Sequence, residues 1–244
     1  MLLKKAINEY LKNSKLIKSN GTYEFEKQHL KNLLKYFNIN NIENSSQINE
    51  KVINDYVLNN RKNQITNKTI NKKINLLKRV FIFNKLECRY LTDFKKLKQT
   101  NKRYDILTKD NLKRLLEYLK TTSDENIIEL TEKIIIYLLF ETGIRRNELL
   151  HIEINNIDIE NNIILLTETK TKNERLVFVT NNLKNLIMKY LQFECDRKYL
   201  LFNYRTNKKY NGDNLRRLFE KIKRITGINK LYPHMLRHTF STYY

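Results

Sequence analysis

Residues 132–149 read EKIIIYLLFETGIRRNEL, and this stretch decides the fold. Residues 134–140 are apolar on every side of a helix, which is typical of the central buried helix of a domain. The apolar run is far shorter than the ~20 residues that cross a bilayer. We therefore expect a soluble domain built around this helix, with Gly143 at its end and no membrane partner.

Most of the chain is predicted to form helices joined by short polar loops, because it contains only four Gly and one Pro. Before residue 95, three apolar stripes at helical spacing predict three helices. The stripes are Leu30, Leu33, Leu34 and Phe37; Ile48, Val52, Ile53, Tyr56 and Val57; and Ile70, Ile74, Leu77 and Phe81. Later, Thr108 is the expected N-cap of an amphipathic helix, and helical patterns recur at residues 182–193 and 214–225.

Residues 152–179 are instead rich in β-branched residues and contain polar turns at 160–162 and 171–173. This pattern predicts a small antiparallel sheet. The fold class is therefore mainly α with a small antiparallel β-sheet (α+β). Residues 95–103 are basic and poor in apolar side chains, so we interpret them as a linker between domains at 1–98 and 104–244.

The charge balance indicates a polyanionic partner. The chain has 47 Lys and Arg against 26 Asp and Glu, a net charge of +21, which is natural for a nucleic-acid-binding protein. Lys, Asn and Ile are all over-used, so part of the excess can reflect coding bias. Residues 197–237 nevertheless hold twelve Lys or Arg and two acids, and this local concentration favours DNA as the partner.

The two cysteines, Cys88 and Cys195, lie outside any metal-ligand or redox spacing. We therefore expect no metal and no cofactor. Lys4, Lys5 and Glu9 interrupt the region where a signal peptide would carry its apolar core, so we expect a cytoplasmic protein.

Residues 142–149, TGIRRNEL, follow the buried helix directly and allow two interpretations. In the first, Gly143 caps the helix and Arg145 pairs with Glu148 in an ordinary turn. In the second, Gly143 turns the chain so that Arg145 points into a cleft, where its guanidinium grips two phosphate oxygens. Glu148 would then hold Arg145 in place.

Lys170 lies in residues 169–175, TKTKNER, between two predicted strands. It is either a solvated residue of a hairpin turn or a mobile ammonium that can protonate a departing alkoxide.

Residues 233–238 read PHMLRH, in which Pro233 favours a helix start. His234, Arg237 and His238 then share one helix face. A metalloprotease zinc pair would need Glu where this chain has Met235, which argues against a metal. A plain surface helix stays open, but an arginine between two imidazoles favours a phosphate-contacting site.

These three segments, in this order, resemble the motifs of the tyrosine recombinases, also called phage integrases. The family carries Thr-Gly-x-Arg-x-x-Glu-Leu, matched by residues 142–149, then a lysine in the turn of a small sheet, and then His-x-x-Arg-His, matched by residues 234–238. Residues 103–116 resemble the opening of its catalytic domain, and the helical N-terminal part resembles its core-binding (SAM-like) domain. The resemblance implies a recombinase or integrase of a mobile element that breaks and rejoins DNA without a metal.

The resemblance also implies a role for each matched residue. Arg145 and Arg237 would hold the non-bridging oxygens of the scissile phosphate, and Lys170 would be the general acid for the 5′ leaving group. His234 would be a general base or a phosphate contact, with Glu148 and His238 supporting the site.

The family continues past this motif to a further His or Trp and a tyrosine nucleophile, whereas this chain ends at Tyr244. Tyr244 would lie about 10 Å beyond Arg237 along a helix, so we do not expect it to be the nucleophile. We expect a C-terminally truncated catalytic domain that lacks its last helices and acts on double-stranded DNA with further copies or intact recombinase protomers. The alternatives are a non-catalytic DNA-binding remnant and a type IB topoisomerase.

Overall fold

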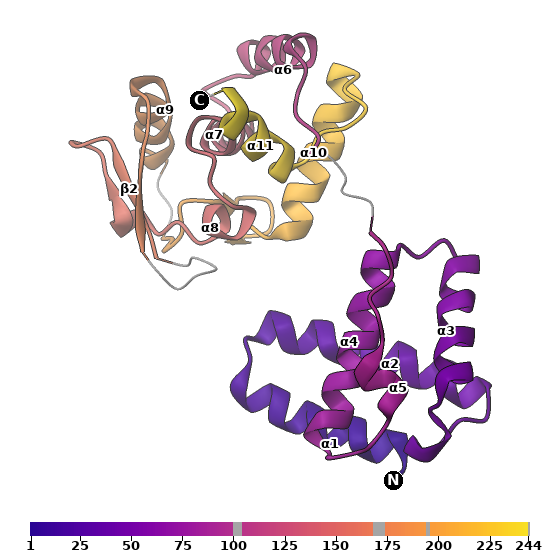
Figure 1. Ribbon diagram of the computed structural model, residues 1–244. Helices are drawn as coiled ribbons and strands as arrows, with labels where there is room; N and C mark the ends of the chain where they lie inside the picture. The colour runs from indigo at the N-terminus through magenta and orange to yellow at the C-terminus, as the bar shows by residue number, and fades with distance from the viewer. Residues whose placement is uncertain (100–103, 168–173, 194–195, 244) are drawn as a thin grey trace. The chain divides into compact units, whose positions relative to one another are not determined.

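A computed structural model describes residues 1–99, 104–167, 174–193 and 196–243 (Figure 1). The chain divides into two compact units, Met1–Lys102 and Arg103–Tyr244, each with its own core. In the described residues, no helix is both long and apolar enough to span a membrane.

The N-terminal unit is a set of helices in the part of it that the structure describes. They are α1 (Leu3–Ile17), α2 (Asn20–Ile39), the 3-10 turn η1 (Ser45–Gln47), α3 (Glu50–Lys62), α4 (Asn67–Phe83) and α5 (Arg89–Asp93). The predicted apolar stripe of α4 is buried, and that of α2 is buried except for the half-buried Leu34, which confirms both helices. The predicted stripe that begins at Ile48 starts too early, because Asn49 caps α3 by accepting the Val52 amide and leaves Ile48 in the preceding turn.

A buried carboxylate joins three helices of this unit. Glu26 of α2 has a side chain only 1% exposed and accepts hydrogen bonds from Ser14 (2.6 Å) and Tyr10 (3.1 Å) of α1. It also pairs with Lys18 (2.8 Å) and with Arg79 of α4 (2.9 Å). Burial alone would raise the pKa of Glu26, but the bonds from Lys18 and Ser14 outweigh it, so the pKa is lowered.

The first part of the expected linker lies on α4. The side chain of Asn71 bonds both the amide and the carbonyl of Leu97, at 2.9 Å each, and Asn67 donates to the carbonyl of Lys98 at 2.8 Å. Basic composition alone gave no sign of these bonds. Residues 97 and 98, which belong both to the expected domain at 1–98 and to the expected linker, are thus held on the helical unit.

The C-terminal unit surrounds α7 (Ile127–Thr142), which packs against α9 (Asn181–Leu191) and α11 (Pro233–Tyr243). The other helical segments are α6 (Lys109–Thr121), α8 (Arg146–Leu150), the 3-10 turn η2 (Ile154–Asn156) and α10 (Gly212–Thr226). The expected central buried helix is confirmed, because nearly every residue of α7 from Leu130 to Leu139 is buried. Thr108 caps α6 as expected, accepting the Asn111 amide.

The small sheet is antiparallel, with the order β1 (Ile157–Asp158), β2 (Ile163–Leu166) and β3 (Arg175–Phe178). In the β2–β3 ladder, Leu166 lies opposite Arg175. A second pair, β4 (Phe202–Asn203) and β5 (Lys208–Lys209), escaped prediction because strands of two residues show no alternation. The α+β fold class is thus confirmed, while the turn expected at 171–173 lies outside the described residues.

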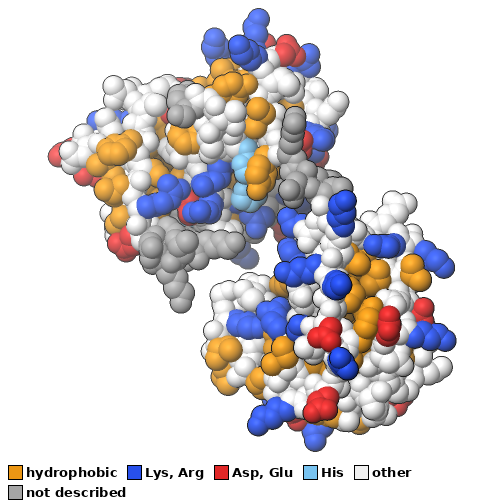
Figure 2. Space-filling view, in the orientation of Figure 1, with side chains coloured by type: hydrophobic (Ala, Val, Ile, Leu, Met, Phe, Trp, Pro, Cys, Tyr) orange, Lys and Arg blue, Asp and Glu red, His pale blue; other side chains and the backbone are white. Residues whose placement is uncertain are grey.

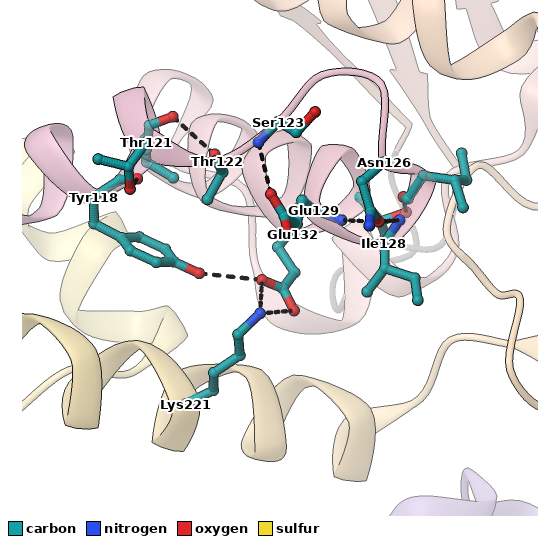
Figure 3. Close-up of polar contacts among 12 residues, drawn as sticks. Tyr118, Thr121, Thr122, Ser123, Asn126, Ile128, Glu129, Glu132 and Lys221 are labelled. Carbon is teal, nitrogen blue, oxygen red and sulfur yellow. Dashed lines mark hydrogen bonds and ion pairs between the residues drawn. The ribbon is translucent and has the colours of Figure 1, made fainter.

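One acidic residue of α7 is buried because its charge is matched (Figure 3). The carboxylate of Glu132 accepts a hydrogen bond from Tyr118 of α6 at 3.2 Å and pairs with Lys221 of α10 at 2.7 Å. Since a buried carboxylate without partners would be costly, this arrangement fixes α6 and α10 against the central helix.

Candidate functional site

The site starts at the turn after α7. Gly143 caps this helix with φ +58°, a left-handed conformation that favours glycine. A Cβ atom at Gly143 would lie 2.3 Å from Cδ1 of Phe240, so the aromatic ring of α11 occupies the space that any other side chain would need. The turn therefore brings α11 against the end of α7.

Arg145 follows this turn as the N-cap of α8, and Glu148 anchors it. Glu148 Oε2 accepts the backbone amide of Arg145 at 2.7 Å, and Oε1 accepts Nη1 of the same residue at 2.7 Å. The Glu148 side chain is 1% exposed, whereas that of Arg145 is 36% exposed. The turn thus caps a helix and contains an ion pair, and it also holds the guanidinium of Arg145 so that part of it stays accessible to solvent.

A second guanidinium on Glu148 was missed by sequence reasoning. Arg175, the first residue of β3, places Nη2 2.8 Å from Glu148 Oε2. Burial would raise the pKa of Glu148, but hydrogen bonds from Arg175 and Arg145 hold it at about 2. The available signal was weak: an arginine that opens a strand next to a basic turn resembles any solvated hairpin residue.

Helix α11 contains the motif at residues 233–238 and lies against the same turn. Arg237 Nη1 donates to the carbonyl of Gly143. The rings of His234 and His238 stack with centroids 6.4 Å apart, and His238 lies 4.3 Å from the ring of Tyr104. His234, Arg237 and His238 therefore do share a face, and Arg237 reaches the turn that also carries Arg145.

The electrostatics of this cluster favour an anion. Desolvation lowers the pKa of Arg237, as do the nearby charges of Arg145 and Arg175. The pKa of His234 is also lowered, first by desolvation and then by the charges of His238, Arg146, Arg237 and Arg145. Figure 2 shows histidine side chains next to Lys and Arg side chains on this face of the C-terminal unit. An anion with two oxygens would relieve the mutual repulsion of these cations.

Lys170 and Tyr244, which the sequence analysis considered for the site, lie outside the described residues, as does Cys195. Tyr243 is described, and its hydroxyl lies 3.5 Å from the carbonyl of Leu107. Within the described ranges, no group of three His, Cys, Asp or Glu side chains could hold a metal ion.

Comparison with known proteins identifies the family to which this chain belongs. Residues 105–244 match the model of the phage integrase family, and the match covers more than half of the chain. The chain therefore belongs to the phage integrase family of tyrosine recombinases, and the resemblance seen in its motifs is confirmed.

Particular relatives support this assignment. Tyrosine recombinase XerA of Saccharolobus solfataricus is 36% identical over 149 residues, which is 59% of this chain and 44% of that protein's length. The probable integrase/recombinase of Acholeplasma phage L2 is 27% identical over 217 residues, covering 88% of this chain and 73% of its own.

A solved structure supports the fold. The lambda integrase (75–356) dimer bound to a COC′ core site has a TM-score of 0.79 with 13% identity, over 99% of this chain and 89% of that one.

The chain spans less than half the length of the XerA relative.

Proposed function

We propose that this chain binds double-stranded DNA and activates a backbone phosphate for the breakage and rejoining of strands. One observation carries the proposal: Arg145 follows the Gly143 turn, and Arg237 bonds the carbonyl of that turn. Two fixed guanidiniums at one turn suit the two non-bridging oxygens of a phosphodiester. The net charge of +21 supports a nucleic-acid partner.

The proposed chemistry needs no metal, because side chains supply each role. Arg145 and Arg237 neutralise the phosphate oxygens as charge develops in the transition state. His234, whose pKa is lowered, is neutral at pH 7 and can accept the proton of the attacking hydroxyl. We assign the protonation of the 5′ leaving oxygen to Lys170 and a bracing role to His238, whose ring contacts that of Tyr104.

The partners follow from the same proposal. The helical unit Met1–Lys102 would act as the core-binding clamp on DNA, and the reaction would involve further copies or other recombinase protomers. The cytoplasm is the proposed compartment, since DNA is the substrate there.

A direct test measures phosphate activation without depending on which chain supplies the attacking tyrosine. Duplexes that bind the protein tightly are selected from a random library, and single ribonucleotides are then placed at successive positions. A 2′-hydroxyl next to the scissile phosphate attacks phosphorus intramolecularly, the bond to the 5′ oxygen breaks, and a 2′,3′-cyclic phosphate forms. We expect cleavage at one position, in the presence of a metal chelator.

A second measurement uses a nicked suicide duplex, with an intact recombinase that carries its tyrosine but lacks its own first arginine. A covalent adduct that depends on Arg145 of this chain is the expected result. Binding with neither cleavage nor adduct would mean that the chain is a non-catalytic DNA-binding module. Relaxation of plasmid without a preferred site would instead indicate a topoisomerase.

A further inference from the structure

The carboxylate of Glu148 lies between two guanidiniums and is almost fully buried. Arg145 binds Oε1 at 2.7 Å, Arg175 binds Oε2 at 2.8 Å, and the carboxylate is 1% exposed. Water therefore screens the negative charge poorly. Arg145 and Glu148 alone would form a nearly neutral pair, and Arg145 would then offer a phosphate little net charge.

Phosphodiester transfer increases the demand for positive charge. The phosphodiester is a monoanion, and attack by a deprotonated hydroxyl adds a second negative charge to the group around phosphorus. Two uncompensated guanidiniums would match this charge. Arg237 supplies one, but Arg145 supplies the other only if a third cation neutralises Glu148.

We propose that Arg175 is a positioning residue of the recombination site, which neutralises Glu148 and leaves the charge of Arg145 available to the scissile phosphate. This inference rests on the proposed function. Glu148 and Arg175 then act together. Glu148 orients the guanidinium of Arg145, and Arg175 neutralises the negative charge that Glu148 brings to the site.

The position of Arg175 suits this task. It is the first residue of β3 and lies opposite Leu166, whose side chain is buried, so the sheet fixes its backbone. Its charge also acts on Arg237, whose pKa it helps to lower. The cluster around Glu148 thus contains three guanidiniums and one carboxylate. Its positive charge exceeds what neutralises the buried acid, and the excess suits the negative charge of the transition state.

Three variants separate charge compensation from simple tethering. Arg175→Lys keeps the charge, Arg175→Gln keeps only a hydrogen-bond donor, and the double variant Arg175→Gln with Glu148→Gln removes both charges. Cleavage of the ribonucleotide duplex is measured at saturating protein, together with DNA affinity. Lys113→Gln is the matched control, because it removes one positive charge from an exposed residue of α6 that is outside the basic residues 197–237.

We expect Arg175→Lys to cleave within about threefold of wild type and Arg175→Gln to be about 10- to 100-fold slower, with DNA affinity nearly unchanged. The double variant should be at least about threefold faster than Arg175→Gln, although it has lost both native partners. A purely structural tether predicts the opposite order, because each further change would weaken the same contact.

Several results would overturn the inference alone: wild-type cleavage by Arg175→Gln, a double variant slower than the single one, or a loss of DNA affinity in proportion to the loss of rate. An inactive wild-type protein would instead refute the proposed function as well. Urea unfolding at pH 7 and pH 3 provides a readout without DNA. If Arg175 compensates Glu148, Arg175→Gln loses less stability on acidification than wild type, provided that it is folded at pH 7.

Discussion

Glu26 in the N-terminal unit and Glu148 in the C-terminal unit have side chains that are equally buried, at 1% exposure, and each is paired with two cations. Their surroundings differ. Glu26 also accepts two hydroxyl hydrogen bonds and joins three helices, so its partners form a closed network. Around Glu148, a further cation, Arg237, lies near the pair, and the charge of Arg145 helps to lower the pKa of the His234 imidazole. A buried acid whose partners form a closed network between helices supports packing, whereas a buried acid with a third cation beside its pair supports an anion site.

The largest effect should come from removing one arginine from each network. Arg145→Ala is expected to reduce cleavage of the ribonucleotide duplex by about 10³-fold, because it removes a fixed donor from the transition state. Arg79→Ala, which removes a cation from Glu26, should leave the cleavage rate of the saturated complex within about threefold. Both rates are measured alongside DNA affinity, which should change little for Arg145→Ala since many other phosphate contacts remain. Equal loss of rate in the two variants would abolish the distinction between the networks.

Much of this framework could be predicted from sequence, because it depends on local signals. The stripes of α2 and α4, the cap at Thr108 and the apolar run of α7 are periodic or adjacent features, and the structure contains the corresponding helices. The pair of Arg145 and Glu148 is also local, since its members are three positions apart.

The remaining contacts depend on packing between distant segments. Arg175 meets Glu148 across 27 positions of the sequence, and Arg237 meets Gly143 across 94. The contact between the ring of Phe240 and Gly143 likewise cannot be predicted from the pattern of the sequence. Periodicity describes which face of an element is buried but not which distant side chain meets it, so motif spacing indicated candidate residues of the site without its geometry.

The second prediction concerns stability. Glu26→Ala removes the anion from a buried network and leaves Lys18 and Arg79 without it, so we expect the N-terminal unit to lose about 2 kcal/mol. Lys18 and Arg79 are partly exposed and can turn to water, which keeps the loss below that of a fully buried pair. Urea unfolding followed by fluorescence from tyrosines of this unit measures the change, with Glu24→Ala at an exposed ion pair as the control. A similar loss in both variants would show that the buried network contributes nothing special.

The third prediction uses acid. The pKa of each of the two buried acids is lowered on folding, to about 2 for Glu148, so their contribution to stability is complete above the unfolded pKa of about 4.5. It is lost as the pH falls from there toward the folded value. Glu148→Gln should therefore be less sensitive to acidification between pH 5 and 3 than wild type, as measured by the urea midpoint. Identical midpoint shifts would mean that Glu148 is not held ionised in solution.

The smallest expected effect concerns the cations near His234 in the C-terminal unit. His234 has a lowered pKa, and the charge of Arg146 contributes to this after desolvation and His238. Arg146→Gln removes that charge without changing Arg145, Arg237 or Glu148, so the pKa of His234 should rise slightly, because the two groups form a partly screened pair. Proton NMR titration of the imidazole measures it, and the rise should shrink at 1 M salt. Below the resulting pKa, His234 is protonated and cannot accept a proton, so cleavage by Arg146→Gln should decline at a slightly higher pH than cleavage by wild type. An unchanged titration would place Arg146 too far from the imidazole to belong to the cation cluster.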